Sequence, residues 1–235
     1  MKKLAPNIVT SLNLLCGSIA VISAINDQLV KAALFVLLGI FFDFFDGFIA
    51  RLLKSESPLG FQLDSISDMV TSGLAPGVIM FQLLSNSLTE SSYHSTIIPY
   101  FSLLIVLGSA FRLARYNISK PQSIFFTGLP TPANAMFIIG LALVREYSGI
   151  NFFLALLNDP FFLIILTLIL TFLLNSNFKL ITFKFKTYGI KENFSRYCIV
   201  LMSVFSLIFF DFAGISLSII FYFVISLIYP PIIKN

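Results

Sequence analysis

The chain contains a succession of apolar runs, each near twenty residues long, separated by short polar segments. About 20 residues of α-helix are needed to cross the hydrocarbon core of a bilayer. The runs lack the period-two alternation of membrane β-barrel strands. Hydrophobic residues make up 57% of the chain and charged residues only 11%, against about 25% charged in soluble domains. We therefore expect an all-α, polytopic transmembrane helical bundle.

Eight membrane spans are predicted, at 7–26, 30–53, 62–85, 96–117, 131–148, 158–176, 196–212 and 214–232. The last two are separated only by a turn near Asp211 and Gly214, so six or seven spans remain as alternatives. The sequence contains no internal repeat and no linker. We therefore expect a single domain over residues 1–235.

The basic residues predict the orientation of these spans. If the N-terminus is cytosolic, only Lys31 and Arg145 lie on the far side of the membrane. The cytosolic side receives Lys2, Lys3, Arg51, Lys54, Arg112, Arg115, Lys120, Lys179, Lys184, Lys186, Lys191, Arg196 and Lys234. The positive-inside rule describes such a skew, so both termini are predicted to be cytosolic, in the cytoplasmic membrane. The net charge of +4 then reflects topology rather than nucleic-acid binding, because the basic blocks are dispersed.

Four of the eleven acidic residues lie in two consecutive apolar segments: Asp43, Asp46, Asp64 and Asp68. An unpaired carboxylate at the centre of a bilayer costs about 2.5–3.5 kcal/mol on insertion scales. The predicted topology places all four at the cytosolic ends of the second and third spans. A cation is expected beside them.

The spacing of the aspartates narrows the chemistry. Asp43 and Asp46 share one helical stripe with two small residues, Gly47 and Ala50, which allow a bulky group to approach the backbone. Asp64 and Asp68 lie one turn apart on the next helix and can face the first pair. Carboxylates that converge without His or Cys favour a hard divalent cation, namely Mg²⁺, Mn²⁺ or Ca²⁺. Four acids can also hold two ions, as in phosphoryl transfer.

Arg51 follows Asp46 by little more than one helical turn, where its guanidinium can bind a phosphate. The complete pattern is Asp43-x2-Asp46-Gly47-x2-Ala50-Arg51-x8-Gly60-x3-Asp64-x3-Asp68. It resembles the signature of the CDP-alcohol phosphotransferase family at each of its positions. The resemblance implies a core of six transmembrane helices, here with two more, and a homodimer. It also implies an enzyme that displaces CMP from a CDP-linked lipid with the hydroxyl of a second alcohol.

The resemblance assigns roles to the residues of the motif. Asp43, Asp46, Asp64 and Asp68 would bind the metal, and Asp68 would also accept the proton of the attacking hydroxyl. The CDP-lipid would be held by Gly47, Ala50, Arg51, Ser57 and Gly60. A carboxylate beside a divalent ion is a weak base, but the ion acidifies a bound hydroxyl, so this assignment is physically reasonable.

Segments outside the motif concern the acceptor alcohol. The stretches 6–17, 67–77, 111–117 and 128–134 resemble the branch of the family that uses serine. This implies that CDP-diacylglycerol and L-serine give phosphatidylserine and CMP. Arg112, Arg115 and Asn117 end the fourth span, where they could bind the serine carboxylate or a lipid phosphate. Alternatively, both arginines are positive-inside anchors.

Polar residues on the first span recur every three positions, at Asn7, Thr10 and Asn13. They could line the nucleotide pocket, or they could make interhelical hydrogen bonds or caps. Pro130 and Pro132 are interpreted as the start of a helix. The stretch 177–195 alternates basic with aromatic or apolar residues and suits the headgroup region or a structural connector.

Two other functions are alternatives to serine transfer. The first keeps the family and changes the acceptor to glycerol-3-phosphate or an inositol. The second is an ion-coupled membrane transporter, because acids within a membrane often mark cation pathways. Transport gives no reason for Gly47, Ala50 and Arg51 to accompany the acids, and the acids gather at one end instead of following a path.

Overall fold

The computed structural model of the chain describes residues 4–55, 57–90, 95–118, 125–183 and 189–229. Its α-helices are α1 (Leu4–Ile25), α2 (Leu29–Leu52), α3 (Pro58–Asp68), α4 (Ala75–Glu90), α5 (Leu103–Ile118), α6 (Thr131–Tyr147), α7 (Asn151–Leu157), α8 (Pro160–Asn175), α9 (Ile190–Phe210) and α10 (Ala213–Ile228). A π-helical segment, η1 (Met69–Leu74), joins α3 to α4, and a 3₁₀ segment, η2 (Ile98–Ser102), precedes α5. Two short strands, β1 (Phe125–Thr127) and β2 (Lys179–Ile181), pair antiparallel.

The helices confirm an all-α integral membrane protein. Five helical segments are long and apolar enough to cross a bilayer: Leu4–Ile25, Leu29–Leu52, Pro58–Thr89, Ile98–Ile118 and Asn193–Phe210. The bent pair α6 and α7 makes a sixth if it counts as one span, and α8 and α10 are shorter apolar helices. Each predicted span thus contains a helix. The count of eight and the cytosolic side remain predictions.

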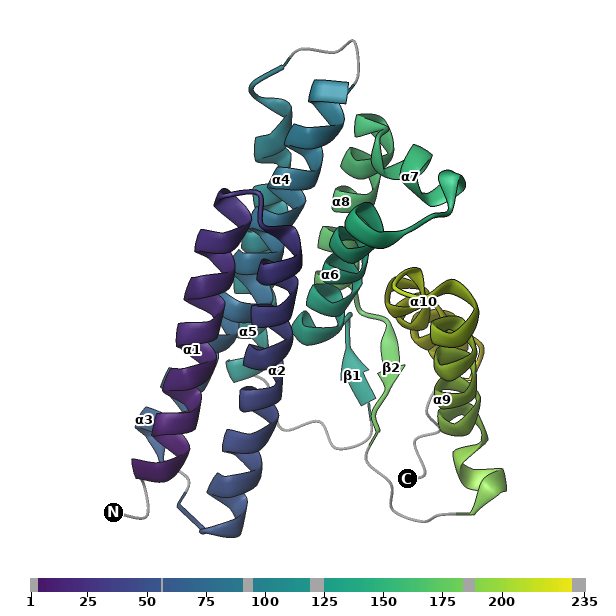
Figure 1. Cartoon of the computed structure of the whole chain (residues 1–235). Helices are drawn as coiled ribbons and strands as arrows, with labels where there is room; N and C mark the ends of the chain where they lie inside the picture. Colours follow the sequence, from purple (N-terminus) through teal and green to yellow (C-terminus); the bar gives the residue numbers. More distant parts are fainter. Residues whose placement is uncertain (1–3, 56, 91–94, 119–124, 184–188, 230–235) are drawn as a thin grey trace.

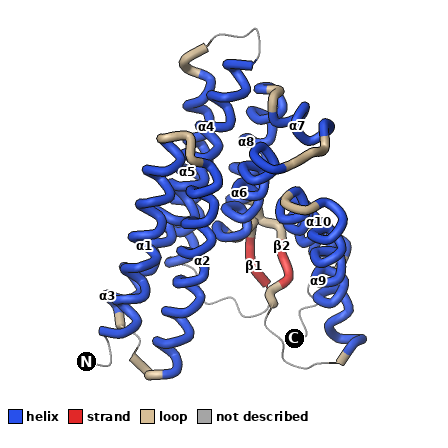
Figure 2. Tube along the Cα trace, in the orientation of Figure 1, coloured by secondary structure: helices blue, strands red, loops and turns tan. Residues whose placement is uncertain are grey.

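In Figure 1 the chain forms two groups of helices with the small sheet between them. Helices α1 to α5 stand together on the left, whereas α9 and α10 form a separate hairpin on the right that packs against α6. Figure 2 shows the two strands, the only strands among the described residues, in red below α6. The lower end of the first group is formed by the start of α1, the end of α2 and the start of α3.

Small residues explain the close packing of α1, α2 and η1. The buried face of α1 contains Gly17, Ala20 and Ala24, and the buried face of α2 contains Ala33 and Gly39. Inside a membrane, helices associate through close van der Waals contact, which small residues permit. A methyl group added to Gly17 or Gly39 would overlap Thr71 of η1. The three segments therefore meet backbone to backbone.

The charges of the described residues segregate between the two ends of the helices. Arg51, Lys54, Arg112, Arg115, Lys179 and Arg196 lie at or near helix and strand ends on the side where α1 begins and α2 ends. Lys31 and Arg145 lie toward the other end, together with Asp27 and Glu146. The predicted lysines at positions 2, 3, 120, 184, 186 and 234 lie outside the described residues. This distribution agrees with the charge skew used to orient the spans.

Three features were absent from the sequence prediction. The stretch 177–195 was interpreted as a headgroup segment or connector, but residues 179–181 form β2, and α9 begins at Ile190 instead of near 196. Helix α7 was not predicted. The third predicted span, 62–85, contains the wide turn η1, which was not predicted. The turn at Asp211 and the helix start at Pro130 and Pro132 were predicted correctly.

Candidate active site

The turn between α2 and α3 positions the aspartates. Helix α2 ends as the backbone N–H of Ser55 donates to the carbonyl of Ala50 at 3.0 Å, with Lys54 at a φ of +48°. This left-handed residue after the last helical turn is a common way to end a helix. Ser57 then caps α3, because its hydroxyl oxygen accepts a hydrogen bond from the backbone N–H of Gly60 at 3.1 Å. The short turn folds α3 back beside α2.

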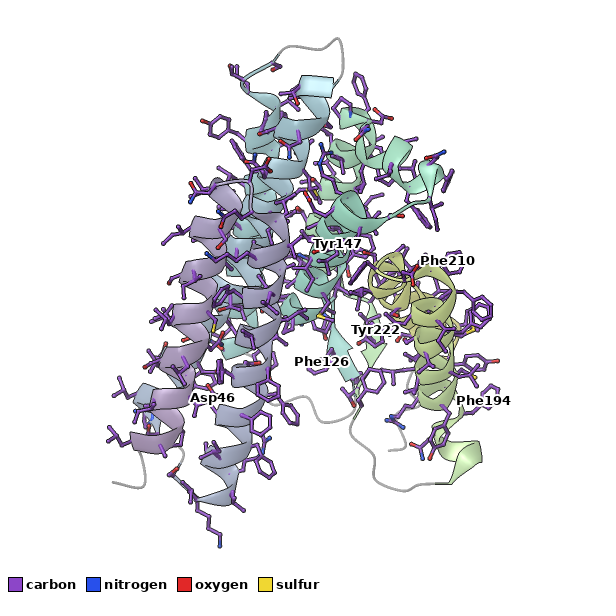
Figure 3. The ribbon with its side chains drawn as sticks, in the orientation of Figure 1. Asp46, Phe126, Tyr147, Phe194, Phe210 and Tyr222 are labelled. Atoms are coloured by element: carbon purple, nitrogen blue, oxygen red, sulfur yellow. The ribbon has the colours of Figure 1, made fainter. Side chains whose placement is uncertain are left out.

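Three of the four aspartates converge across this pair of helices. One carboxylate oxygen each from Asp43, Asp64 and Asp68 lies within 4.8 Å of the others. Like charges this close repel strongly in a partly buried site unless a cation or protons compensate them. Asp46 is 5% exposed and stands outside this group, and its Oδ2 atom has no hydrogen-bond partner among the described residues. Figure 3 labels Asp46 toward the lower end of α2.

The donor set suits a hard divalent cation. All the converging ligand atoms are carboxylate oxygens, which Mg²⁺, Mn²⁺ and Ca²⁺ prefer. The buried, unpartnered oxygen of Asp46 supplies a fourth carboxylate nearby. The site thus fits the predicted type of metal.

Helix α1 supports the aspartates from one side. The side-chain amide of Asn13 donates to Oδ1 of Asp68 at 3.4 Å. The hydroxyl of Ser67 donates to the carbonyl of Thr10 at 3.1 Å, and the hydroxyl of Thr71 donates to the carbonyl of Asn13 at 3.0 Å. These bonds fix α3 and η1 against α1 on both sides of Asp68. Asn13 belongs to the predicted polar stripe, and the structure places it against the aspartate cluster.

The residues predicted to hold the CDP-lipid fall into two places. Around Gly60, a methyl group would lie 3.2 Å from Oδ1 of Asn7 and 3.2 Å from the hydroxyl of Ser57. On α2, a methyl group at Gly47 would lie 3.6 Å from a guanidinium nitrogen of Arg51, so the arginine folds back over the glycine. Both places lie within about one helical turn of an aspartate, and each combines polar side chains with a glycine.

Two further predicted residues have structural partners. Thr10 is 3% exposed, and its hydroxyl donates to the carbonyl of Pro6 at 3.0 Å. The carbonyl of Ala50 accepts the hydrogen bond that ends α2, while its side chain stays half-exposed. The structural alternative considered for Thr10 therefore has support from its contacts.

Arg112 and Arg115 line one small cavity. The cavity measures about 30 Å³, and its wall is formed by Arg112, Arg115, Tyr116, Phe126, Thr127, Leu174, Asn175 and Ser176. Arg112 is 9% exposed, and its Nε atom has no hydrogen-bond partner among the described residues. Arg115 is exposed and donates to the carbonyl of Asn175 at 3.2 Å. A buried guanidinium with an unpartnered donor favours an anionic ligand.

Asn117 lies apart from this cavity. Its side-chain amide donates to the hydroxyl of Ser65 on α3 at 2.9 Å. A second contact joins the same two segments. Ser109, eight residues before Asn117 on α5, lies against Gly73, eight residues after Ser65: a methyl group at Gly73 would lie 3.0 Å from Cβ of Ser109. These two contacts run antiparallel along α5, and Arg112 lies between them, opposite the stretch from Ser65 to Gly73 that contains Asp68. The charges of Arg112 and Asp68 are within electrostatic range.

Sequence reasoning missed Asn175 and the strand β1, which both contribute to the cavity wall, and the strand β2, which pairs with β1. Asn175 ends α8, and its amide donates to the carbonyl of Gly108 at 2.9 Å while Oδ1 has no partner among the described residues. The run of apolar, β-branched and aromatic residues from Leu180 to Phe183 was a signal for β2. Nothing in the sequence indicated that a segment more than fifty residues away would pair with it.

Comparisons with known proteins agree with the motif. The sequence profile of the CDP-alcohol phosphatidyltransferase family matches residues 3–185. A CDP-diacylglycerol–serine O-phosphatidyltransferase from Bacillus subtilis (strain 168) is 32% identical over 141 residues, which is 58% of this chain and 74% of the relative. A protein of the same name from Methanocaldococcus jannaschii is 32% identical over 149 residues, or 63% of this chain and 65% of the relative.

An archaetidylserine synthase from Methanothermobacter thermautotrophicus is 30% identical over 148 residues, covering 62% of this chain and 60% of the relative. The chain thus spans less than two thirds of the length of both archaeal relatives. The family profile, however, matches well over half of the chain and includes all the converging aspartates. This chain belongs to the CDP-alcohol phosphatidyltransferase family.

Proposed function

We propose that this protein transfers a phosphatidyl group from CDP-diacylglycerol to the hydroxyl of L-serine, giving phosphatidylserine and CMP. The observation that carries the proposal is the convergence of Asp43, Asp64 and Asp68 within the motif of the family. The names of the bacterial and archaeal relatives support serine as the acceptor.

In the proposed reaction the serine oxygen forms a bond to the phosphorus of the phosphatidyl group. The bond from that phosphorus to the CMP oxygen breaks, and CMP leaves with the electron pair. Asp68 receives the serine proton on its carboxylate, with Asn13 holding Oδ1 of that carboxylate. Positioning of this kind removes much of the entropic cost of bringing two substrates together.

The diphosphate of the CDP-lipid is assigned to the surroundings of the aspartates. Arg51 lies over Gly47, where the guanidinium can form paired hydrogen bonds to phosphate oxygens. Asn7, Ser57 and Gly60 form the second contact region. Ala50 and Thr10 are assigned to the same binding site. These assignments come from the family resemblance and are supported by the proximity of the residues.

Asp43, Asp46, Asp64 and Asp68 would hold one or two divalent cations, Mg²⁺ or Mn²⁺, with Ca²⁺ as a further candidate. A bound cation of this kind neutralises charge on phosphate oxygens and lowers the pKa of a coordinated hydroxyl. The four aspartates would hold the cation close to the carboxylate of Asp68 that accepts the proton. The proton acceptor and the phosphate group under attack would then be positioned by the same four side chains.

The cavity beside Arg112 is proposed to bind the serine carboxylate. The buried guanidinium of Arg112, whose Nε atom has no hydrogen-bond partner among the described residues, is a suitable donor to a carboxylate. Arg112 lies between the two contacts that join α5 to the stretch from Ser65 to Gly73, which contains Asp68. In the proposal, one serine molecule places its carboxylate in the cavity and its hydroxyl near Asp68. Asn117 faces α3 and is assigned to support of that helix.

The proposal also covers the topology, oligomeric state and membrane location of the protein. We infer one domain over residues 1–235, eight spans, a homodimer and an active site that faces the cytosol from the cytoplasmic membrane. The gathering of basic residues at the aspartate end supports the orientation. A transporter is less consistent with the arrangement, because Asp43, Asp64 and Asp68 gather at one point instead of along a path.

An acceptor panel tests the function. Purified protein is supplied with CDP-diacylglycerol and Mg²⁺ or Mn²⁺, then with serine, glycerol-3-phosphate or inositol, and CMP release is measured. Of the three acceptors, we expect only serine to cause CMP release. The release should be lost when a chelator is added and should return when the cation is restored. Release driven by glycerol-3-phosphate would disprove the serine assignment and leave the family intact. No release with any of the three acceptors would contradict the proposed reaction.

A further inference from the structure

The open edge of the small sheet is closed by α10. In the antiparallel pair, Ile181 lies opposite Phe125 and Leu180 opposite Phe126. The backbone N–H of Gly128 donates to the carbonyl of Phe178 at 2.9 Å. Alternate residues of a strand direct their backbone groups toward opposite neighbours, so Phe178 and Leu180 face β1 whereas Ile181 faces away from it.

Two side chains of α10 bind both backbone groups of Ile181. The hydroxyl of Tyr222 donates to the carbonyl of Ile181 at 3.0 Å, and the N–H of Ile181 donates to the hydroxyl oxygen of Ser226 at 3.3 Å. Tyr222 and Ser226 are one helical turn apart on the same face of α10. Both are buried, at 6% and 0% exposed. The helix thus takes the place of a third strand at this residue.

This contact leads directly to the cavity beside Arg112. Phe126 and Thr127 of β1 form part of the cavity wall, and β1 is paired with β2. The phenol of Tyr222 is also within electrostatic range of the Arg112 guanidinium. Figure 3 shows Tyr222 on the side of α10 that faces the sheet, near Phe126. The family profile ends at residue 185, before α10 begins.

We propose that Tyr222 and Ser226 are positioning residues for the acceptor pocket: by holding Ile181 they fix the sheet that forms the pocket wall. The inference rests on the proposed function and goes beyond it, because it gives the C-terminal hairpin a role in acceptor binding. The ring of Tyr222 packs independently of its hydroxyl, with its centroid 5.9 Å from that of Phe183 in a stacked arrangement. The hydroxyl can therefore be removed while this packing is kept.

The test uses Tyr222→Phe and Ser226→Ala in the full-length protein, with Ser218→Ala as the matched control. Ser218 lies on the same helix, but its hydroxyl donates to Gly214 within the hairpin and does not contact the sheet. We expect the KM for serine to rise about threefold to tenfold in the first two variants, the change associated with loss of one buried hydrogen bond. The kcat and the KM for CDP-diacylglycerol should stay near wild type, as should all constants of Ser218→Ala.

Hydrogen exchange supplies a readout that is independent of catalysis. The amide of Ile181 should exchange faster in both variants and at the wild-type rate in Ser218→Ala. Faster exchange with an unchanged KM for serine would overturn the positioning role. A fall in kcat together with an equal rise in the KM for serine and the KM for CDP-diacylglycerol would overturn it as well. If the wild-type protein uses glycerol-3-phosphate, the proposed function fails. The positioning role is then tested by comparing the KM for glycerol-3-phosphate between the wild-type protein and the same three variants.

Discussion

The aspartate end of helices α1 to α3 and the hairpin of α9 and α10 are held in place in different ways. In the first region, side chains of α3 and η1 bond to the backbone of α1, and glycines let the helices approach closely. In the hairpin, Ser206 and Ser218 bond mainly within the hairpin, and the outer faces expose large apolar residues such as Leu201 and Ile208. The hairpin reaches its neighbours through a few anchors, among them Ser216 to the carbonyl of Phe137.

This difference separates two uses of polar residues in a membrane protein. Around the aspartates, polar groups hold a geometry that the chemistry requires, and small changes should be costly. On the hairpin, apolar side chains suit contact with lipid, and most positions should tolerate change. The exceptions should be the few anchors to α6 and β2.

The largest effect is expected from Asp68→Asn, which removes the carboxylate assigned to the proton while keeping the shape of the side chain. We expect turnover to fall by about 10²–10⁴-fold, the range typical of losing a general base. Nucleotide binding should be partly retained. The measurement is CMP release together with CDP-diacylglycerol binding.

The control for this variant is Asp211→Asn, at the turn between α9 and α10. It changes the charge in the same way but far from the other aspartates, so activity should stay near wild type. Full activity in Asp68→Asn would remove its assignment as base and ligand.

A smaller effect is expected from packing at the aspartate end. Gly39→Ala would place a methyl group 2.9 Å from Oδ1 of Asn13 and against Thr71. Overpacking of this kind costs about 1–3 kcal/mol. Gly149→Ala is the control, because no heavy atom lies within 4 Å of its added methyl group. Unfolding midpoints in mild detergent should fall for the first and stay nearly constant for the second; equal midpoints would show that the helices can separate at no cost.

The smallest effect is expected on the surface of the hairpin. Leu201 is 67% exposed and Ile199 is 2% exposed on the same helix. Leu201→Ala should change the free energy of unfolding by less than about 0.5 kcal/mol, whereas Ile199→Val, which removes fewer atoms, should cost about 0.5–1.5 kcal/mol. The same unfolding assay measures both. A larger loss for Leu201→Ala would indicate that this face is covered by protein, for example by a second subunit.

The sequence predicted the helices and the aspartate cluster because both depend on local spacing. Apolar runs long enough to span a bilayer predict membrane helices directly. Acids one turn apart lie on the same face of their helix, so two such pairs on consecutive helices can converge. The contact of Asn13 with Asp68 was harder to predict, since it depends on the rotation of α1 relative to α3. A three-residue spacing indicates a face of a helix but not its neighbour.

The remaining features depend on contacts between distant segments. The pairing of Phe125 with Ile181, and of Ile181 with Tyr222, joins three parts of the chain that share no local pattern. The wide turn η1 had a weak signal in Pro76, which lacks the N–H needed for a regular helix. Its position could not be assigned without the packing of Gly73 against Ser109.

The wide turn from Met69 to Leu74 has a consequence for how chain length can vary in this protein. A π-helical turn accommodates one residue more than an α-helical turn does, so deleting one residue here would still leave a continuous helix. The deletion would, however, rotate all that follows by about 100° relative to Asp64 and Asp68. The apolar face of α4, with Ile79 and Leu83 fully buried, would then turn away from its neighbours. The π-helical segment therefore allows the face that carries Asp64 and Asp68 and the packing face of α4 to be oriented independently along one long helix.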